Sequence, residues 1–182
     1  AAAVTHPPGL AAEIDAAGGY RSDVTAARDG DPSRLLADAR RMTTGRFRLA
    51  RAWAREPNWD LMVVVEIGLD RLHHAFWRFV DPDHPRHQPT GPYASAVSDY
   101  HALLDREIAA LLEAAGPGTA VLVVSDHGAR SALGGFRINT WLVEQGDLVL
   151  HRGPQRPARL APGMVDWTRT RAWAAGGYCG RV

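Results

Sequence analysis

Two short apolar runs, each followed closely by acidic and histidine residues, constrain the fold of this chain more than any other feature. The first run lies within residues 59–67, and the second comprises residues 121–124. Neither run alternates apolar with polar residues, as expected of strands that are covered on both faces. Helical patterns flank and separate the runs. The alternation predicts an α/β domain with a mostly parallel central sheet flanked by helices.

Helices are predicted where apolar residues recur at helical spacing between residues that start or stop a helix. Pro32 in a first turn and the pair Gly18 and Gly19 after a last turn are such signals. The predicted helices are 9–17, 31 to about 55, 69–79, 93–115 and 138–145. Residues 148–150 are predicted to extend as a further strand, and the prolines between 154 and 162 indicate an irregular segment.

We expect three regions along the chain, with the chemistry in the middle one. Residues 1–58 are predicted to form a helical lead-in, and residues 59–150 an α/β core that carries metal ligands. Residues 151–182 are predicted to form an irregular C-terminal segment.

The composition of the chain limits the kinds of partner and the cellular compartment that we expect for it. The formal net charge is +1, with 46% hydrophobic and 23% charged residues, so no strong field favours a nucleic acid polymer. The longest apolar run, 61–65, is far shorter than the ~20 residues of a membrane span, so no membrane segment is expected. The single cysteine, Cys179, cannot form an internal disulfide. A chain without an internal disulfide fits a reducing compartment, and we expect a cytoplasmic protein.

The candidate site combines two Asp/His pairs that follow the two apolar runs. Asp70 and His74 are four residues apart, on one face of a predicted helix. Asp126 and His127 directly follow residues 121–124, and Gly128 is expected to let the backbone turn sharply there. Ligands bind beyond the carboxyl ends of strands in open α/β sheets. A carboxylate with an imidazole suits zinc, manganese or iron.

Simpler interpretations stay open for each of these residues. An Asp and a His four apart on a helix commonly form a surface hydrogen bond, and Asp126 could cap a following helix. His73 is expected to be a partly exposed neighbour of the site or a residue that supports a ligand. Four further histidines are interpreted as surface residues: His84, His87, His101 and His151.

The motifs resemble those of a known enzyme family. Residues 121–128 (VLVVSDHG), 135–142 (GFRINTWL) and the following Gly146-Asp147-Leu148 resemble the alkaline phosphatase superfamily. Residues 59–77, which include the Asp70-x-x-x-His74 motif, and residues 165–172 resemble its type I phosphodiesterase and nucleotide pyrophosphatase branch. The resemblance implies an alkaline-phosphatase-like α/β fold and metal-dependent hydrolysis of phosphoester bonds in a small-molecule phosphoester or nucleotide.

The resemblance also implies roles for individual residues. Asp70 and His74 would bind one divalent ion, and Asp126 and His127 a second, with zinc expected and manganese as the alternative. The family's nucleophile is a Thr or Ser that forms a covalent phospho-enzyme.

The chain departs from the family pattern in two ways. No residue of 1–58 matches the nucleophile, since Thr43 and Thr44 lie in the middle of a predicted helix, and no Gly-His supplies a third ligand for the first metal. We therefore expect an internal segment of a catalytic domain that is inactive by itself. A phosphomutase or sulfatase of the same superfamily, a non-catalytic binding domain, and an unrelated α/β domain with structural Asp/His pairs are the alternatives.

Overall fold

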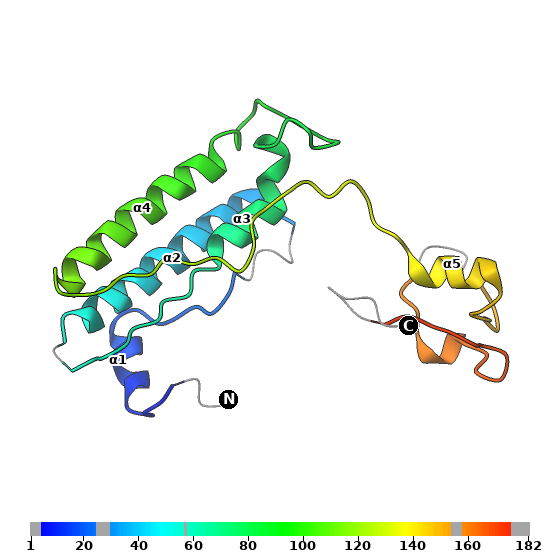
Figure 1. Ribbon diagram of the computed structural model, residues 1–182, viewed down its shortest axis with the longest axis horizontal. Coiled ribbons are helices and arrows are strands. Elements are labelled where there is room, and N and C mark those ends of the chain that lie inside the picture. Colours follow the sequence, from blue (N-terminus) through cyan, green and yellow to red (C-terminus); the bar gives the residue numbers. More distant parts are fainter. Residues whose placement is uncertain (1–4, 25–29, 57, 154–157, 176–182) are drawn as a thin grey trace. The chain divides into compact units, whose positions relative to one another are not determined.

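The computed structural model describes residues 5–24, 30–56, 58–153 and 158–175, and it divides into two compact units. The first unit is Ala1–Leu133 and the second is Gly134–Val182. Figure 1 shows helices joined by long open stretches of chain. Among the described residues, the only strand pairing is an isolated antiparallel bridge between Leu150 and Val165.

Local sequence signals place the helices close to their predicted positions. The elements are α1 (Leu10–Ala16), α2 (Pro32–Ala54), α3 (Gly68–Phe76), η2 (Trp77–Phe79), α4 (Ala96–Ala115), α5 (Ile138–Gln145) and η3 (Pro162–Met164). The Asp31 side chain caps α2 by accepting a hydrogen bond from the Ser33 backbone N–H at 2.9 Å. Gly146 ends α5 with a φ of +76°, which glycine adopts without steric cost. The predicted helices are therefore confirmed, with small shifts at their ends.

The core of the first unit lies among α2, α3 and α4, which pack against one another in pairs. Each helix contributes a side chain that is fully inaccessible to solvent: Ala39 from α2, Leu72 from α3 and Tyr100 from α4. Phe76 adds an aromatic contact with Tyr93, with ring centroids 5.2 Å apart. Burial of this apolar stripe fixes the orientation of α3, the helix that carries the first Asp/His pair.

A buried polar network fixes the start of α3. Glu66 accepts hydrogen bonds from the Gly68 backbone N–H at 2.5 Å and from the Thr43 hydroxyl at 3.0 Å. Thr43 also shares a 2.5 Å hydrogen bond with the Tyr100 hydroxyl, and burial raises the pKa of Tyr100. Arg46 donates to the Val65 carbonyl at 2.6 Å. The network ties α2 and α4 to the residues immediately before α3.

The predicted mostly parallel sheet is wrong for the described residues. Residues 61–66 and 121–125 belong to no strand, and no backbone hydrogen bond joins the two segments in the part of the chain that the structure describes. Their side chains are not covered on both faces either, since Val63 is 75% exposed and Leu122 is 86% exposed. An apolar run favours a strand only where a second backbone is available to pair with it, and neither run has such a partner among the described residues.

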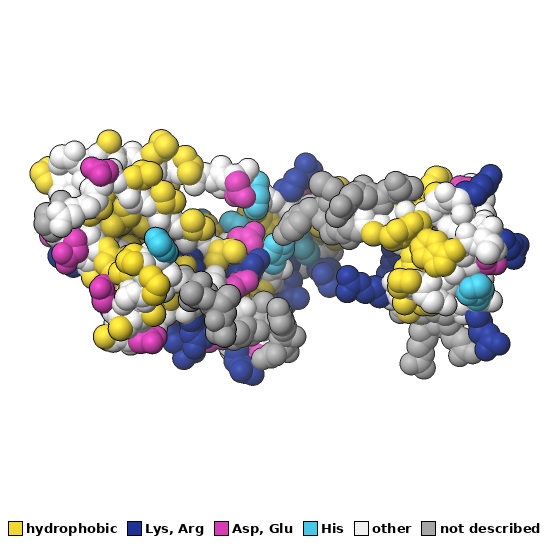
Figure 2. Space-filling view, turned by 90° about the horizontal axis from the view of Figure 1, so that it is seen from below, with side chains coloured by type: hydrophobic (Ala, Val, Ile, Leu, Met, Phe, Trp, Pro, Cys, Tyr) yellow, Lys and Arg dark blue, Asp and Glu magenta, His cyan; other side chains and the backbone are white. Residues whose placement is uncertain are grey.

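The first unit, which is the larger body in Figure 2, has apolar side chains exposed on its visible face. The exposed large apolar residues of these two segments are Leu61, Val63, Val65, Val121, Leu122, Val123 and Val124. The alkaline-phosphatase-like sheet therefore does not form among the described residues, and the first unit is an all-helical arrangement.

The second unit is smaller and is organised around α5. Leu142, Leu148 and Val165 form its buried cluster. Asn139 pairs with Ala174 as a backbone would, donating to its carbonyl and accepting from its N–H, both at 2.8 Å. The predicted strand at 148–150 is reduced to the single bridge at Leu150, and Cys179 lies outside the described residues. None of the described helices combines the length and the apolar character needed to cross a membrane.

Candidate functional site

The first Asp/His pair lies on α3, as its spacing predicts. The distance from Asp70 Oδ1 to His74 Nε2 is 3.6 Å, with Asp70 partly buried and His74 exposed. Asp70 Oδ2 lies 3.1 Å from the Arg71 guanidinium, and Arg71 also forms an ion pair with Asp23 at 2.8 Å. A carboxylate oxygen and an imidazole nitrogen therefore occupy one face of a helix that the core holds in place.

The second pair lies on the open segment that follows residues 121–124. His127 Nε2 is 3.7 Å from Asp126 Oδ2, and both side chains are exposed. The His127 ring donates from Nδ1 to the Gly128 carbonyl at 2.9 Å, and the Ser125 hydroxyl donates to the His127 carbonyl at 2.5 Å. Gly128 does not adopt a positive φ, and the chain bends at Asp126.

Electrostatics links the two pairs. The pKa of His127 is raised, first by its hydrogen bond to the Gly128 carbonyl and then by the charges of Asp126 and Asp70. The charge of Asp70, which lies 57 positions away in the sequence, makes the smallest of these contributions. In the described part of the chain, no three His, Cys, Asp or Glu side chains converge on one point that could hold an ion.

The donor set nevertheless fits divalent metals of the zinc and manganese type. Each pair offers one carboxylate oxygen and one imidazole nitrogen within 4 Å of each other. Mixed oxygen and nitrogen donors are the ligands that zinc accepts, whereas calcium prefers oxygen alone. Two protein ligands for each ion are fewer than the three of a typical catalytic zinc site, so we expect weak binding.

A hydrogen bond that the sequence did not reveal anchors the segment after the second pair. The Ser131 hydroxyl donates to Asp81 Oδ2 at 2.5 Å, and the Trp77 indole N–H donates to the same oxygen at 3.1 Å. The pKa of Asp81 is lowered, chiefly by the hydrogen bond from Ser131. Asp81 also accepts from the Asp83 backbone N–H at 2.9 Å, which is an Asx turn. The Asp-Pro-Asp sequence at 81–83 was the available sign of that turn, but nothing in the sequence pointed to Ser131.

His73, which lies between Asp70 and His74 in the sequence of α3, belongs to an aromatic cluster. Its ring packs edge-on against Trp77 at 4.9 Å and lies 6.1 Å from the His101 ring. The pKa of His73 is lowered, first by desolvation and then by the charge of His101, while His127 also contributes. The pKa of His73 therefore responds to charged groups of both Asp/His pairs, since Asp70, His74 and His127 all contribute to it.

Neither threonine of α2 is placed as a nucleophile. Thr43 is buried, and its hydroxyl is engaged with Glu66 and Tyr100. Thr44 lies beside it in the middle of the same helix. Both positions agree with the sequence pattern, in which the two threonines fall inside a helix.

Comparison with known proteins identifies the family. A sequence profile described as Type I phosphodiesterase / nucleotide pyrophosphatase matches residues 3–173, a range that includes both Asp/His pairs. Comparison with curated proteins and with solved structures gives no match. The profile covers more than half of the chain and confirms the resemblance seen in the motifs. The chain belongs to the type I phosphodiesterase and nucleotide pyrophosphatase family of the alkaline phosphatase superfamily.

Proposed function

We propose that this chain supplies the metal ligands for hydrolysis of phosphoester bonds, of the phosphodiesterase or nucleotide pyrophosphatase type. The observation that carries the proposal is that each Asp/His pair places a carboxylate oxygen within 4 Å of an imidazole nitrogen, in a chain that belongs to this family. The substrate would be a small-molecule phosphoester or a nucleotide.

Each Asp/His pair would hold one divalent ion, zinc first and manganese as the alternative. Asp70 and His74 would supply one ligand pair, with α3 keeping them on one face. Asp126 and His127 would supply the other. Ions in such sites polarise phosphoryl oxygens and lower the pKa of a bound water. The carboxylates would also hold these ions by charge.

Metal binding is the first test. Titration calorimetry with Zn²⁺ and Mn²⁺ should show weak binding by the chain, reduced about tenfold or more in Asp70→Asn and in Asp126→Asn, because each variant removes an anionic ligand. Asp105→Asn is the matched control, because Asp105 is an exposed carboxylate on α4 outside both pairs. Equal affinity in all four proteins would contradict the ligand assignment.

Turnover is the second test, measured on the same samples with bis-p-nitrophenyl phosphate. Metal-dependent turnover that is lost in Asp126→Asn would support hydrolysis. Metal binding without turnover would support the assignment of the metal ligands but not the hydrolytic activity. It would favour a non-catalytic binding domain that retains these ligands. Faster turnover of p-nitrophenyl sulfate than of the phosphodiester would favour a sulfatase instead.

A further inference from the structure

An arginine-rich groove in the first unit lies between the chain that follows α1 and one side of α2. The groove has a volume of about 430 Å³. Its charged lining residues are all arginines, Arg21, Arg40, Arg41, Arg46 and Arg48, and none of the four proposed metal ligands lines it. All 21 basic residues of the chain are arginine. The groove therefore presents planar guanidinium groups only, which suit the paired oxygens of a phosphate.

Among the described residues, the carboxylates around the groove are too few to neutralise its arginines. Arg21 and Arg41 share a single partner, Asp38, at 4.0 and 2.7 Å. Arg46 is buried and lies 3.7 Å from Glu66. Among the described residues these two carboxylates are the acidic partners of the five arginines, which leaves three positive charges in excess.

The remaining arginines of the groove have no acidic partner among the described residues. Arg48 donates to the carbonyl of Ala17, which is a neutral group. Arg40 is exposed and has no ion pair with a described residue. Both arginines lie on α2, so the helix holds them at fixed spacing. A concave surface with unbalanced charge of one sign attracts counter-ions more strongly than a flat surface does.

Gly45 leaves room for a ligand in this groove. Gly45 lies in the middle of α2, and a Cβ atom built on it would meet no atom within 4 Å. The hydroxyl-bearing Thr44 lines the groove next to it. The helix surface at Gly45 carries no side chain. This leaves space for an anion to approach the guanidinium groups.

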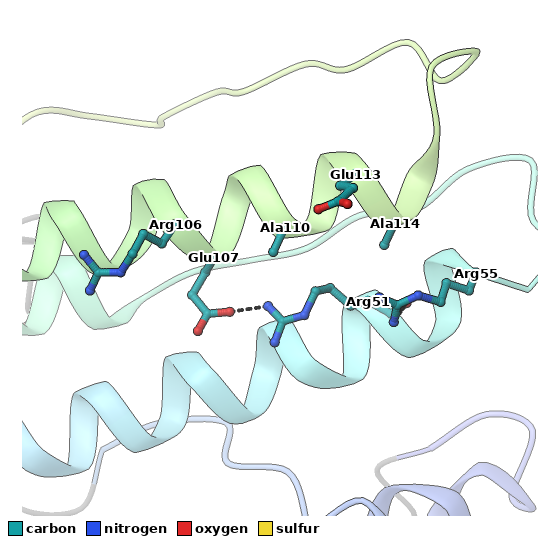
Figure 3. A pocket seen from close by; sticks show the side chains of 7 residues that line it. All are labelled: Arg51, Arg55, Arg106, Glu107, Ala110, Glu113 and Ala114. Atoms are coloured by element: carbon teal, nitrogen blue, oxygen red, sulfur yellow. Dashed lines mark hydrogen bonds and ion pairs between the residues drawn. The ribbon is translucent and has the colours of Figure 1, made fainter.

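The groove between α2 and α4 provides a contrast within the same unit. Figure 3 shows Arg51 and Arg55 at the C-terminal end of α2, and Arg106, Glu107 and Glu113 on α4, around that groove. Arg51 and Glu107 form an ion pair across the two helices. The groove between α2 and α4 therefore has three arginines and two glutamates, an excess of one positive charge. The groove beside α1 has the larger excess, three positive charges over its acidic partners among the described residues.

We propose that the groove beside α1 binds a small phosphate-bearing anion with several negative charges, independently of metal. Three guanidinium groups in excess match a multiply charged anion better than a single charge such as chloride or acetate. The site is separate from the proposed hydrolytic function, because it uses none of the metal ligands. Screening by salt should weaken the binding, since most of the arginines are exposed.

Pyrophosphate is the probe, titrated into the 182-residue chain in the presence of EDTA at low salt and followed by calorimetry. We expect saturable binding that weakens about tenfold or more in Gly45→Glu, because the new carboxylate would lie among the arginines. Gly45→Ala is its matched control and should bind like the unaltered chain. Arg40→Gln should weaken binding by roughly three- to tenfold.

Two further variants check that the binding belongs to this groove. Arg106→Gln removes a positive charge from the groove between α2 and α4 and should leave binding unchanged, as should Asp126→Asn, which alters the proposed metal site. Circular dichroism checks that α2 is retained, and Arg40→Gln tests the proposal even if Gly45→Glu fails to fold. Absence of saturable binding, or equal weakening in Arg40→Gln and Arg106→Gln, would overturn the proposal.

Discussion

The two Asp/His pairs lie on segments that differ in nearly every physical respect. Asp70 and His74 lie on α3, a helix whose opposite face buries Leu72 and Phe76 in the core. Asp126 and His127 lie on an open segment after Val124, which is 77% exposed. The first pair is positioned by packing. The second is positioned by local hydrogen bonds and by one side-chain link at Ser131.

The difference comes from where each kind of backbone finds its hydrogen bonds. A helix satisfies its N–H and C=O groups internally, so one apolar face against a core is enough to fix it. A strand can satisfy them only against another strand, which must come from elsewhere in the sequence. Substitutions at matched positions should therefore have different effects on the two segments.

The largest difference should appear on removal of an apolar side chain. Phe76→Ala should lower the free energy of unfolding by about 3–5 kcal/mol, because Phe76 is buried and the cavity would be lined by Phe79 and Tyr93. Leu122→Ala should change it by less than about 0.5 kcal/mol, because Leu122 is already in solvent. Urea unfolding of both variants measures the difference. Equal losses would show that residues 121–124 are buried and would break the comparison.

The next largest effect concerns the glycine beside each pair. A Cβ at Gly68 would overlap the Tyr100 hydroxyl oxygen, whereas a Cβ at Gly128 would meet nothing within 4 Å. Gly68→Ala should therefore destabilise the chain by roughly 1–3 kcal/mol, and Gly128→Ala should be nearly neutral. Thermal unfolding compares the two variants. A neutral Gly68→Ala would mean that Tyr100 can move aside without loss of its network.

A smaller effect is expected at the one link that anchors the second segment. Ser131→Ala removes the hydrogen bond to Asp81, so the pKa of the Asp81 carboxyl should rise toward its ordinary value. In the unaltered chain this lowered pKa stabilises the fold at pH values above the ordinary pKa, and the contribution is lost as the pH falls through the lowered value. Carbon NMR titration of Asp81 measures the change, with Ser98→Ala as the control on α4. An unchanged pKa of Asp81 in Ser131→Ala would show that the Ser131 hydroxyl does not hold this segment to Asp81.

The smallest effect is a difference in titration between two histidines. In the metal-free chain, the pKa of His73 should lie below the ordinary value of 6.5 because the ring is desolvated, and that of His127 above it because of the Gly128 carbonyl and Asp126. The His73 contribution to stability is present above pH 6.5 and is lost as the pH falls through the lowered pKa. The His127 contribution is present below pH 6.5 and is lost as the pH rises through the raised pKa. Proton NMR titration measures both, and identical pKa values would erase the distinction between the two environments.

Part of the site could be predicted from the sequence because it depends on local spacing. The helical spacing of Asp70 and His74 places them on one face, and their 3.6 Å separation follows from it. The adjacency of Asp126 and His127 likewise brings them within 3.7 Å. The hydrogen bond between Ser131 and Asp81 spans 50 residues and has no local pattern, so the sequence could not predict it.

The sequence by itself determined the helices, their caps and the family. Asp31 before Pro32 and Gly146 after Gln145 act on neighbouring backbone groups, and the motifs at 70–74 and 125–128 carry the family resemblance within a few residues. Only the tertiary structure decided the fate of the two apolar runs. Whether such a run becomes a strand depends on a partner backbone that no window of sequence contains, and here neither run finds one among the described residues.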